Sequence, residues 1–255
     1  MEPSEYQMMY TVEDRHWWYV GMQQISVNLL RQFYPHPQPA SRQILDAGCG
    51  TGAAMGYLSP FGQVFGFDYS PLALQFCRQR GLHNLYQGSV CVLPFENGRF
   101  DLITSFDVLC HQSIGDYHVP LAEFYRVLKP GGRLFLRLPA YNWLHAHHDQ
   151  VVHTVRRFTV SELRHAFHKI GFLPEKLSYA NTLLFPLALG KRLTERLRPP
   201  QGDTSDVKPN PPWQDDLLVH LLRAEAQWLN RFNLPIGLTV IAIGRKPIPS
   251  RETIS

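Results

Sequence analysis

The chain has 255 residues, of which 44% are hydrophobic and 18% charged, and its formal net charge is +4. These proportions exclude a disordered chain and a coiled coil, and the small net charge without any run of five Lys or Arg argues against a nucleic-acid partner. The four cysteines form no CxxC pair, so the sequence suggests neither a zinc site nor a disulfide framework. No signal peptide or bilayer-spanning stretch is visible, and we expect a cytoplasmic protein without stable membrane insertion.

Short apolar runs alternate with longer amphipathic stretches through the middle of the chain. The strands are expected at 43–47, 63–67, 85–87, 100–106 and 133–138, and the helices between them near 51–59, 71–80 and 119–128. Helices at about 182–198 and 214–232 and a late strand at 238–244 follow. Strands that alternate with helices of this length predict an α/β fold with a doubly wound, mostly parallel sheet covered on both faces.

We divide the expected domain into four segments. Residues 1–40 form an aromatic-rich N-terminal helical cap, and residues 41–180 form the cofactor-binding α/β core. Residues 181–235 form a helical lid insertion, whose Pro-rich stretch at about 199–213 is expected to be a mobile loop. Residues 236–255 supply the last strand of the core and a tail.

A glycine-rich turn, Asp46-Ala47-Gly48-Cys49-Gly50-Thr51-Gly52, follows the first expected strand. Glycines let the backbone turn sharply beside a ligand, and a helix N-terminus favours a carboxylate or phosphate. Asp68 ends the second strand about 20 residues after the first glycine, where an acid binds ribose hydroxyls in nucleotide-binding sheets. The spacing Gly48-x-Gly50-x-x-Ala53 also satisfies the relaxed dinucleotide fingerprint, so an NAD-type oxidoreductase remains an alternative. Asp46 and the third glycine argue against it, because a carboxylate there suits a cationic amino group and not a pyrophosphate.

Four segments share their order and spacing with a known family. They are residues 44–52, Gly66-Phe67-Asp68-Tyr69-Ser70, Leu93-Pro94-Phe95 with Phe100-Asp101-Leu102-Ile103, and Val127-Leu128-Lys129-Pro130-Gly131-Gly132. Together they resemble the class I S-adenosylmethionine-dependent methyltransferases over roughly residues 43–138. The resemblance implies a Rossmann-like sheet of seven strands, the cofactor S-adenosyl-L-methionine and the product S-adenosyl-L-homocysteine.

The resemblance also implies roles for the residues of these motifs. The glycine loop would pass under the methionine moiety, with Asp46 near its amino group. Asp68 would bind the ribose hydroxyls and Tyr69 would flank the adenine, which Ser89 and Val90 would contact in place of the family's usual acid. Phe106 would lie below the transferable methyl group, unless it packs in the core. The expected cofactor-binding residues are Asp46, Gly48, Gly50, Gly52, Asp68, Tyr69, Ser89, Val90 and Phe106.

A histidine-rich segment, residues 139–159, leaves the fifth expected strand, where open α/β sheets bind ligands. Methyl transfer to O or N requires removal of a proton, for which His is suited near pH 7. The expected catalytic residues are His148, Asp149, His153 and Tyr141, and the substrate-binding set includes His111, His145, Arg156 and Arg157. Two alternatives stay open: side chains that only hold a lid in place, and a metal site from His145, His147, Asp149 and His153. The i, i+2 spacing of His145 and His147 disfavours the metal, and none is predicted.

The N-terminal segment adds aromatic side chains to the expected acceptor pocket. Its expected substrate-binding residues are Tyr10, His16, Trp17 and Trp18, unless the two tryptophans only anchor their helix. Four runs together resemble a bacterial subfamily of small-molecule class I methyltransferases: His16-Trp17-Trp18-Tyr19, Pro139-Ala140-Tyr141, His148-Asp149 and Arg156-Arg157-Phe158-Thr159. The helix expected after Thr182 has an apolar start and a basic end, which fit either a lid or an interfacial helix that admits a lipid-like acceptor.

These features favour an enzyme that transfers a methyl group from S-adenosylmethionine to O or N of a small, aromatic-containing metabolite. A histidine would assist by deprotonating the acceptor. A small-molecule acceptor is the expected partner, and a homodimer stays open. Besides the oxidoreductase, a non-catalytic S-adenosylmethionine-binding protein remains an alternative.

Overall fold

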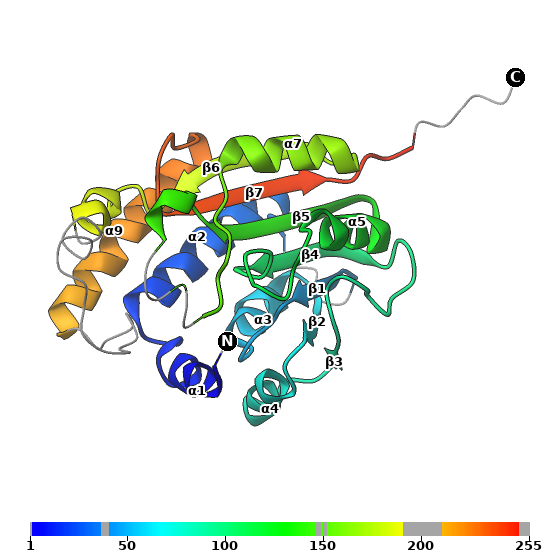
Figure 1. Ribbon diagram of the computed structural model, residues 1–255, viewed down its shortest axis with the longest axis horizontal. Coiled ribbons are helices and arrows are strands. Elements are labelled where there is room, and N and C mark those ends of the chain that lie inside the picture. The colour runs from blue at the N-terminus through cyan, green and yellow to red at the C-terminus, as the bar shows by residue number, and fades with distance from the viewer. Residues whose placement is uncertain (1, 37–40, 146–148, 150–151, 191–210, 250–255) are drawn as a thin grey trace, which may run out of the picture.

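A computed structural model describes residues 2–36, 41–145, 149, 152–190 and 211–249. Its centre is one seven-stranded sheet in the order β3-β2-β1-β4-β5-β7-β6 (Figure 1). The strands are β1 (Gln43–Ala47), β2 (Gln63–Asp68), β3 (Leu85–Gln87), β4 (Phe100–Phe106), β5 (Leu128–Pro139), β6 (Leu173–Ala180) and β7 (Thr239–Arg245). The pairs among β1 to β5 are parallel, and β7 runs antiparallel between β5 and β6. The expected doubly wound, mostly parallel seven-stranded sheet is thus confirmed.

Helices cover both faces of the sheet, because the central strands are apolar on both sides. One hydrophobic cluster contains residues of α2 (Trp17–Phe33), α3 (Ala53–Leu58), α4 (Pro71–Gln79) and α9 (Pro212–Arg231). The cluster on the other face contains residues of α5 (His118–Val127) and α7 (Val160–Ile170). The remaining elements are α1 (Pro3–Val12) and the short 3-10 helices η1 (Ser59–Phe61) and η2 (Asn142–Leu144).

The fifth strand begins earlier than its sequence indicates. The turn-like run 129–132 was expected to separate a helix from a strand at 133, yet β5 already pairs with β4 at Leu128. The register shifts between Phe100 and Leu102, and Gly131 has a φ of +81°. A bulge therefore absorbs the glycines within the strand, and Lys129 binds Asp101 across it at 2.7 Å.

The second half of the expected lid, α9, packs along α2. Leu222, Ala226 and Leu229 of α9 are completely buried, and a Cβ on Gly21 of α2 would lie 2.1 Å from Leu222 Cδ1. Glycine at this position therefore lets the two helices approach closely. The lid role of residues 181–235 stays a prediction, and residues 191–210 lie outside the described ranges. Within those ranges no helix is both long and apolar enough to cross a membrane.

Candidate active site

The glycine-rich loop connects β1 to α3 at the carboxyl edge of the parallel strands. Gly48, Gly50 and Gly52 have φ values of +89°, +53° and +92°, a region that residues with a Cβ rarely adopt. A Cβ on Gly48 would also lie 2.1 Å from Val108 Cγ2. The sequence needs glycine at these positions because the loop turns left-handed and lies against the segment after β4.

Asp68 ties this loop to the end of β2. Its Oδ2 accepts from the Gly50 N–H at 2.9 Å, and its Oδ1 accepts from the Ser70 N–H at 2.8 Å. Burial raises the pKa of the carboxyl group, and the backbone N–H groups act in the opposite direction. Each carboxylate oxygen keeps a second lone pair, so the group can still accept from a ligand hydroxyl.

Asp46 carries an unsatisfied buried oxygen. Its Oδ1 accepts from Thr104 Oγ1 at 2.8 Å, whereas Oδ2 has no hydrogen-bond partner among the described residues. Burial raises the pKa of this carboxyl group to about 7. A buried acceptor without a donor is unfavourable, and a ligand ammonium group would satisfy it. The donor set therefore fits the amino acid end of S-adenosylmethionine, and Asp68 fits its ribose.

The other expected cofactor residues lie along the same edge. Tyr69 is 72% exposed, so its ring is free to flank a ligand. The Ser89 hydroxyl accepts from the Cys91 N–H at 3.3 Å, and Val90 is buried in the core cluster that includes α5. Phe106 packs edge-on against Phe135 with ring centroids 5.2 Å apart. Its position agrees with the core-packing alternative, and its role toward a methyl group stays a prediction.

Helix α1 lies directly over the glycine loop. The sequence predicted a helical cap at the N-terminus but not which of its residues contact this loop. The Met9 methyl group is 3.1 Å from the place a Cβ on Gly50 would take. The Tyr10 ring packs on Phe76 of α4 with the ring centroids 4.8 Å apart, and the Arg80 guanidinium lies 4.9 Å from the Tyr10 ring centroid. Tyr10, expected to bind substrate, therefore helps to attach α1 to α4.

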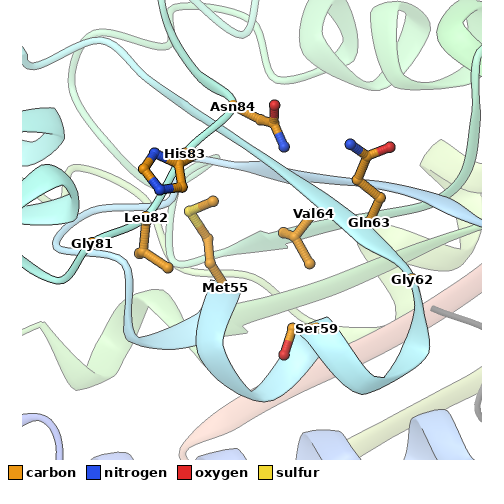
Figure 2. A pocket seen from close by; sticks show the side chains of 9 residues that line it. All are labelled: Met55, Ser59, Gly62, Gln63, Val64, Gly81, Leu82, His83 and Asn84. Atoms are coloured by element: carbon orange, nitrogen blue, oxygen red, sulfur yellow. The ribbon is translucent and has the colours of Figure 1, made fainter. Parts of the chain in front are cut away.

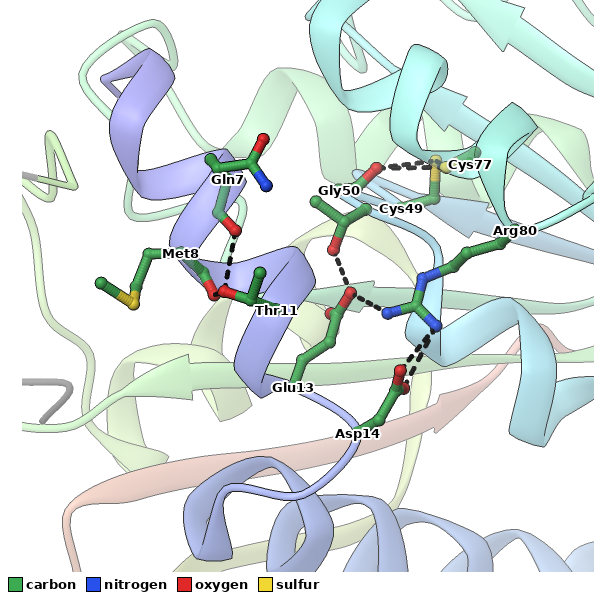
Figure 3. A network of polar contacts seen from close by, with 10 residues as sticks. Gln7, Met8, Thr11, Glu13, Asp14, Cys49, Gly50, Cys77 and Arg80 are labelled. Carbon is green, nitrogen blue, oxygen red and sulfur yellow. Dashed lines mark hydrogen bonds and ion pairs between the residues drawn. The ribbon is translucent and has the colours of Figure 1, made fainter. Parts of the chain in front are cut away.

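A polar network fastens the end of α1 to the loop (Figure 3). Glu13 is buried, accepts a short hydrogen bond from Thr51 Oγ1 and pairs with Arg80 Nη2 at 2.8 Å. Arg80 also binds the exposed Asp14 at 3.0 Å. Burial raises the pKa of Glu13, although its hydrogen bond from Thr51 and its pairing with Arg80 oppose the shift. The network thus joins the end of α1 to the cofactor loop and to the end of α4.

Two histidines lie where the segments after β4 and β5 meet. Backbone hydrogen bonds join the two segments, from the Gln112 N–H to the His153 carbonyl and from the Val155 N–H to the Cys110 carbonyl, both at 2.9 Å. The ring centroids of His111 and His153 are 5.6 Å apart. His153 Nε2 lies 3.0 Å from Glu2 Oε1, and its Nδ1 lies 2.9 Å from Gln112 Nε2. Burial lowers the pKa of His111 to about 4, so this ring is neutral near pH 7.

Asp149 is engaged by an arginine. Arg157 Nη2 donates to both carboxylate oxygens of Asp149, at 2.8 and 3.0 Å, and Asp149 is 3% exposed. His145 Nδ1 lies 3.4 Å from the same carboxylate. His148, the partner expected for Asp149, lies outside the described residues, as does His147 of the metal alternative. Among the residues that are described, no group of three His, Cys, Asp or Glu could hold a metal ion.

Tyr141 belongs to an aromatic cluster that the sequence analysis did not assemble. Its ring stacks on Tyr179 at 4.9 Å and on Trp143 at 5.5 Å, and it meets Phe185 edge-on at 6.1 Å. Tyr179 lies on β6 and Phe185 begins the helical residues 185–190, about 40 residues further along the chain. No local pattern brings these side chains together, so the sequence could not indicate the cluster.

The remaining expected substrate residues make packing contacts. The Arg156 guanidinium lies 4.4 Å from the Tyr117 ring centroid. His16 is buried and caps α2 by accepting from the Trp18 N–H at 3.3 Å. Trp17 and Trp18 are partly buried against the core cluster that contains α2 and α9. These positions agree with the anchoring alternative, while a role toward substrate stays a prediction.

An open pocket lies elsewhere on the part of the chain that the structure describes (Figure 2). It has a volume of about 470 Å³ and is lined by the first residues of β2, part of α3 and the turn after α4. The residues are Met55, Ser59, Gly62, Gln63, Val64, Gly81, Leu82, His83 and Asn84. Because it opens at the amino end of β2, it is not part of the candidate active site.

The sheet order with its antiparallel β7, the left-handed glycine loop and Asp68 define a Rossmann-like fold of the class I methyltransferases. Residues 45–136 match a family model described as a methyltransferase domain. This match covers part of the α/β core and agrees with the resemblance noted in the sequence.

Curated relatives match part of the chain. A demethylmenaquinone methyltransferase of Lactococcus lactis is 40% identical over 101 residues, which cover 36% of this chain and 39% of that protein. A protein of the same name from Thermus thermophilus is 36% identical over 105 residues, or 38% of this chain and 47% of that protein. The chain thus aligns with less than half the length of either relative.

Solved structures match nearly the whole chain in fold. A putative methyltransferase in complex with the Trm112 methyltransferase activator of Haloferax volcanii gives a TM-score of 0.59 at 22% identity, covering 96% of this chain and 94% of that one. A possible histamine N-methyltransferase of Thermotoga maritima gives 0.57 at 19% identity, with 95% of each chain covered. At these identities the matches establish the fold.

Proposed function

We propose that this protein is an S-adenosylmethionine-dependent methyltransferase that acts on O or N of a small, aromatic-containing acceptor. The observation that carries the proposal is the buried, unsatisfied Oδ2 of Asp46 at the carboxyl end of β1, beside three left-handed glycines. Asp46 would bind the ammonium group, Asp68 the ribose hydroxyls, and Tyr69 the adenine face. When bound, the cofactor supplies a methyl group on a positively charged sulfur.

The acceptor would lie beyond the ends of β4 and β5, where open α/β sheets hold their ligands. The cluster of Tyr141, Trp143, Tyr179 and Phe185 supports an aromatic acceptor, because stacked rings of this kind favour contact with another ring and Trp143 is 49% exposed. The names of the curated relatives do not decide the acceptor, since each alignment covers under two fifths of this chain.

Among the expected bases, His153 has the most suitable surroundings. Asp149 is held by Arg157, whereas His153 Nε2 lies 3.0 Å from the Glu2 carboxylate, which would orient the imidazole ring. Its Nδ1 faces the Gln112 amide, so an acceptor hydroxyl would take the place of that amide. His148 and Tyr141 remain alternatives for the same role.

The cofactor part of the proposal is tested by calorimetric titration of the full chain with S-adenosylmethionine and S-adenosylhomocysteine. We expect both compounds to bind with micromolar affinity, and Asp68→Asn to abolish that binding. The control is Glu96→Gln, which changes an exposed acid in the loop between β3 and β4 and should leave the affinity unchanged. Folded protein that binds neither compound would refute the proposal.

The catalytic part is tested with radiolabelled S-adenosylmethionine and a panel of phenols and aromatic amines. We expect His153→Gln to lower kcat by about 100-fold while cofactor affinity is kept, as is typical for a general base. The exposed His165 on α7 supplies the matched control, His165→Gln. Cofactor binding without labelling of any acceptor would favour the non-catalytic alternative.

A further inference from the structure

Two thiol groups meet at the cofactor loop, and the proposed methyl transfer uses neither of them. Cys49 belongs to the glycine-rich loop after β1, and Cys77 lies on α4. Their Sγ atoms are 3.9 Å apart, although the two residues are 28 positions apart in the sequence. Both are free cysteines and both are buried. The two sulfur atoms would have to approach each other by about 2 Å to form a disulfide bond.

The Cys77 side chain packs directly against the glycine loop (Figure 3). Its Sγ donates to the Gly50 carbonyl at 3.2 Å and lies 3.0 Å from the place that a Cβ on Gly52 would take. The N–H of the same Gly50 donates to Asp68, the residue expected to bind the ribose. A change at the Cys77 sulfur therefore reaches the ribose-binding carboxylate through one residue, Gly50.

The other two cysteines lie in a different part of the core. Cys91 and Cys110 belong to the hydrophobic cluster that contains α5 and α7, whereas Cys49 and Cys77 belong to the cluster on the opposite face of the sheet. The chain thus places one pair of thiols in contact, and it does so at the loop that would hold the cofactor.

The surroundings keep the pair protonated at rest. The hydrogen bond with Cys77 and burial raise the pKa of the Cys49 thiol well above its ordinary value, as do the nearby carboxyl groups of Asp46 and Asp68. Burial also raises the pKa of the Tyr6 phenol in α1, and Asp68 and Cys49 raise it further, so Tyr6 lies near both. Because the thiolate is the reactive form, we expect the pair to react slowly while α1 covers the loop and faster when α1 opens.

We propose that Cys49 and Cys77 form a reversible disulfide bond with hydrogen peroxide as the oxidant, and that this bond lowers the affinity of the protein for S-adenosylmethionine. Disulfide bonds in reducing compartments are typically transient and redox-sensing. The formation of the bond does not depend on the proposed function, whereas its effect on cofactor affinity rests on it.

The reaction proceeds in two steps. Cys49, at 6% the more exposed of the two residues, attacks one peroxide oxygen as a thiolate, and the O–O bond breaks. Cys49 becomes a sulfenic acid, and the other oxygen leaves as hydroxide and takes up a proton to give water. The Cys77 sulfur then attacks the sulfenic sulfur, and the S–S bond forms as a second water leaves. The two thiols together lose two electrons and two protons, and the peroxide is reduced to water.

The disulfide bond would disturb the loop at Gly50. Cys77 would lose the S–H that donates to the Gly50 carbonyl, and its sulfur would move toward Cys49. Gly50 would then lose one of the contacts that hold its N–H on the Asp68 carboxylate. Coupling of this kind is reciprocal, so a bound cofactor should in turn disfavour the disulfide.

The disulfide is tested on the full chain by mass spectrometry. The reduced protein is treated with hydrogen peroxide, its remaining thiols are blocked with iodoacetamide in denaturant, and it is digested with trypsin. Cys49 and Cys77 lie on one tryptic peptide, residues 43–78, because no Lys or Arg lies between Arg42 and Arg78. We expect this peptide to carry two labels before oxidation and none afterwards, and dithiothreitol to restore both labels.

The effect on the cofactor is tested by calorimetry of the same samples. We expect the oxidised wild type to bind S-adenosylmethionine more weakly by about tenfold or more, and dithiothreitol to restore the affinity. Cys77→Ser keeps a hydroxyl that can donate to Gly50 and should bind equally well with and without peroxide treatment. The matched control Cys110→Ser removes a buried thiol of the other cluster and should lose affinity on oxidation as the wild type does.

Two results would overturn the proposal. The first is a peptide 43–78 that still carries both labels after peroxide treatment. The second is unchanged affinity in protein whose peptide has lost both labels. Absence of binding by the reduced wild type would instead refute the proposed function, while the loss of both labels would still establish the disulfide, so the two failures are distinct.

Discussion

The buried carboxyl group of Asp46 gives the protein a pH dependence that runs opposite to ordinary acid denaturation. Burial raises the pKa of this group from 3.8 to about 7, so the folded state holds the proton more tightly than the unfolded state does. The folded state is therefore most stable below the pKa that Asp46 has in the unfolded chain. This contribution to stability is lost as the pH rises through the pKa that Asp46 has in the folded protein. A shift of this size corresponds to about 4 kcal/mol of unfolding free energy.

The variant Asp46→Asn isolates this contribution, because a carboxamide does not titrate. Urea unfolding of both proteins without cofactor, from about pH 4 to about pH 8, gives the difference in unfolding free energy. We expect this difference to move in favour of the variant by up to about 4 kcal/mol over the range, most of it below about pH 7. The exposed Asp216→Asn should give a curve parallel to the wild type. A parallel curve for Asp46→Asn would refute the reasoning.

Cofactor affinity provides a second readout of the same group. An ammonium group pairs with the ionised carboxylate, so the proton must leave Asp46 when S-adenosylmethionine binds. Below about pH 7 the affinity of the wild type should fall by up to tenfold for each pH unit. Asp46→Asn should bind more weakly throughout and lose this dependence.

Three further substitutions test how the site is held together. Arg80→Met removes the partner of the buried Glu13, and we expect the rate of amide hydrogen exchange in α1 to rise about 10- to 100-fold. Arg78→Met, on the exposed side of α4, is the control. An unchanged exchange rate would mean that packing alone holds α1. Arg157→Met leaves Asp149 buried without its main partner and should lower the unfolding free energy by about 3 kcal/mol. The control Arg156→Met removes only a contact with the Tyr117 ring and should cost less than about 1 kcal/mol. Equal losses in the two variants would contradict the structural role of Arg157. Gly50→Ala forces a Cβ into a left-handed position and toward Met9, and thermal unfolding should show a loss of about 1–2 kcal/mol.

The cofactor side of the site could be predicted because its residues are close in sequence. Asp46, the glycines and Asp68 lie within 23 residues of one another, on two buried strands whose ends were predicted to within one residue. The order of parallel strands then brings their carboxyl ends to one edge. A linear motif is sufficient for such an arrangement.

The acceptor side could not be predicted in this way, because its contacts join distant parts of the chain. His153 meets Glu2 across 151 residues, and Tyr141 stacks on Tyr179 from another strand. The strand β6 that carries Tyr179 was not assigned in the sequence analysis, since Pro174, Glu175 and Lys176 obscure its apolar alternation. Its register shift between Pro174 and Lys176 moves the following side chains to the other face.

The attachment of α1 connects these two sides and has a consequence for ligand entry. None of the residues of α1 is fully buried, and its apolar contacts are those of Tyr10 with Phe76 and of Met9 with the glycine loop. Polar contacts at its two ends add to this packing: Glu13 with Thr51 and Arg80 at one end, and Glu2 with His153 at the other. Polar contacts can be exchanged for water at small net cost, whereas a buried apolar face cannot. We therefore expect α1, which covers the cofactor loop, to open more easily than a helix with a fully buried apolar face such as α9, and its opening would release the cofactor loop and His153 together.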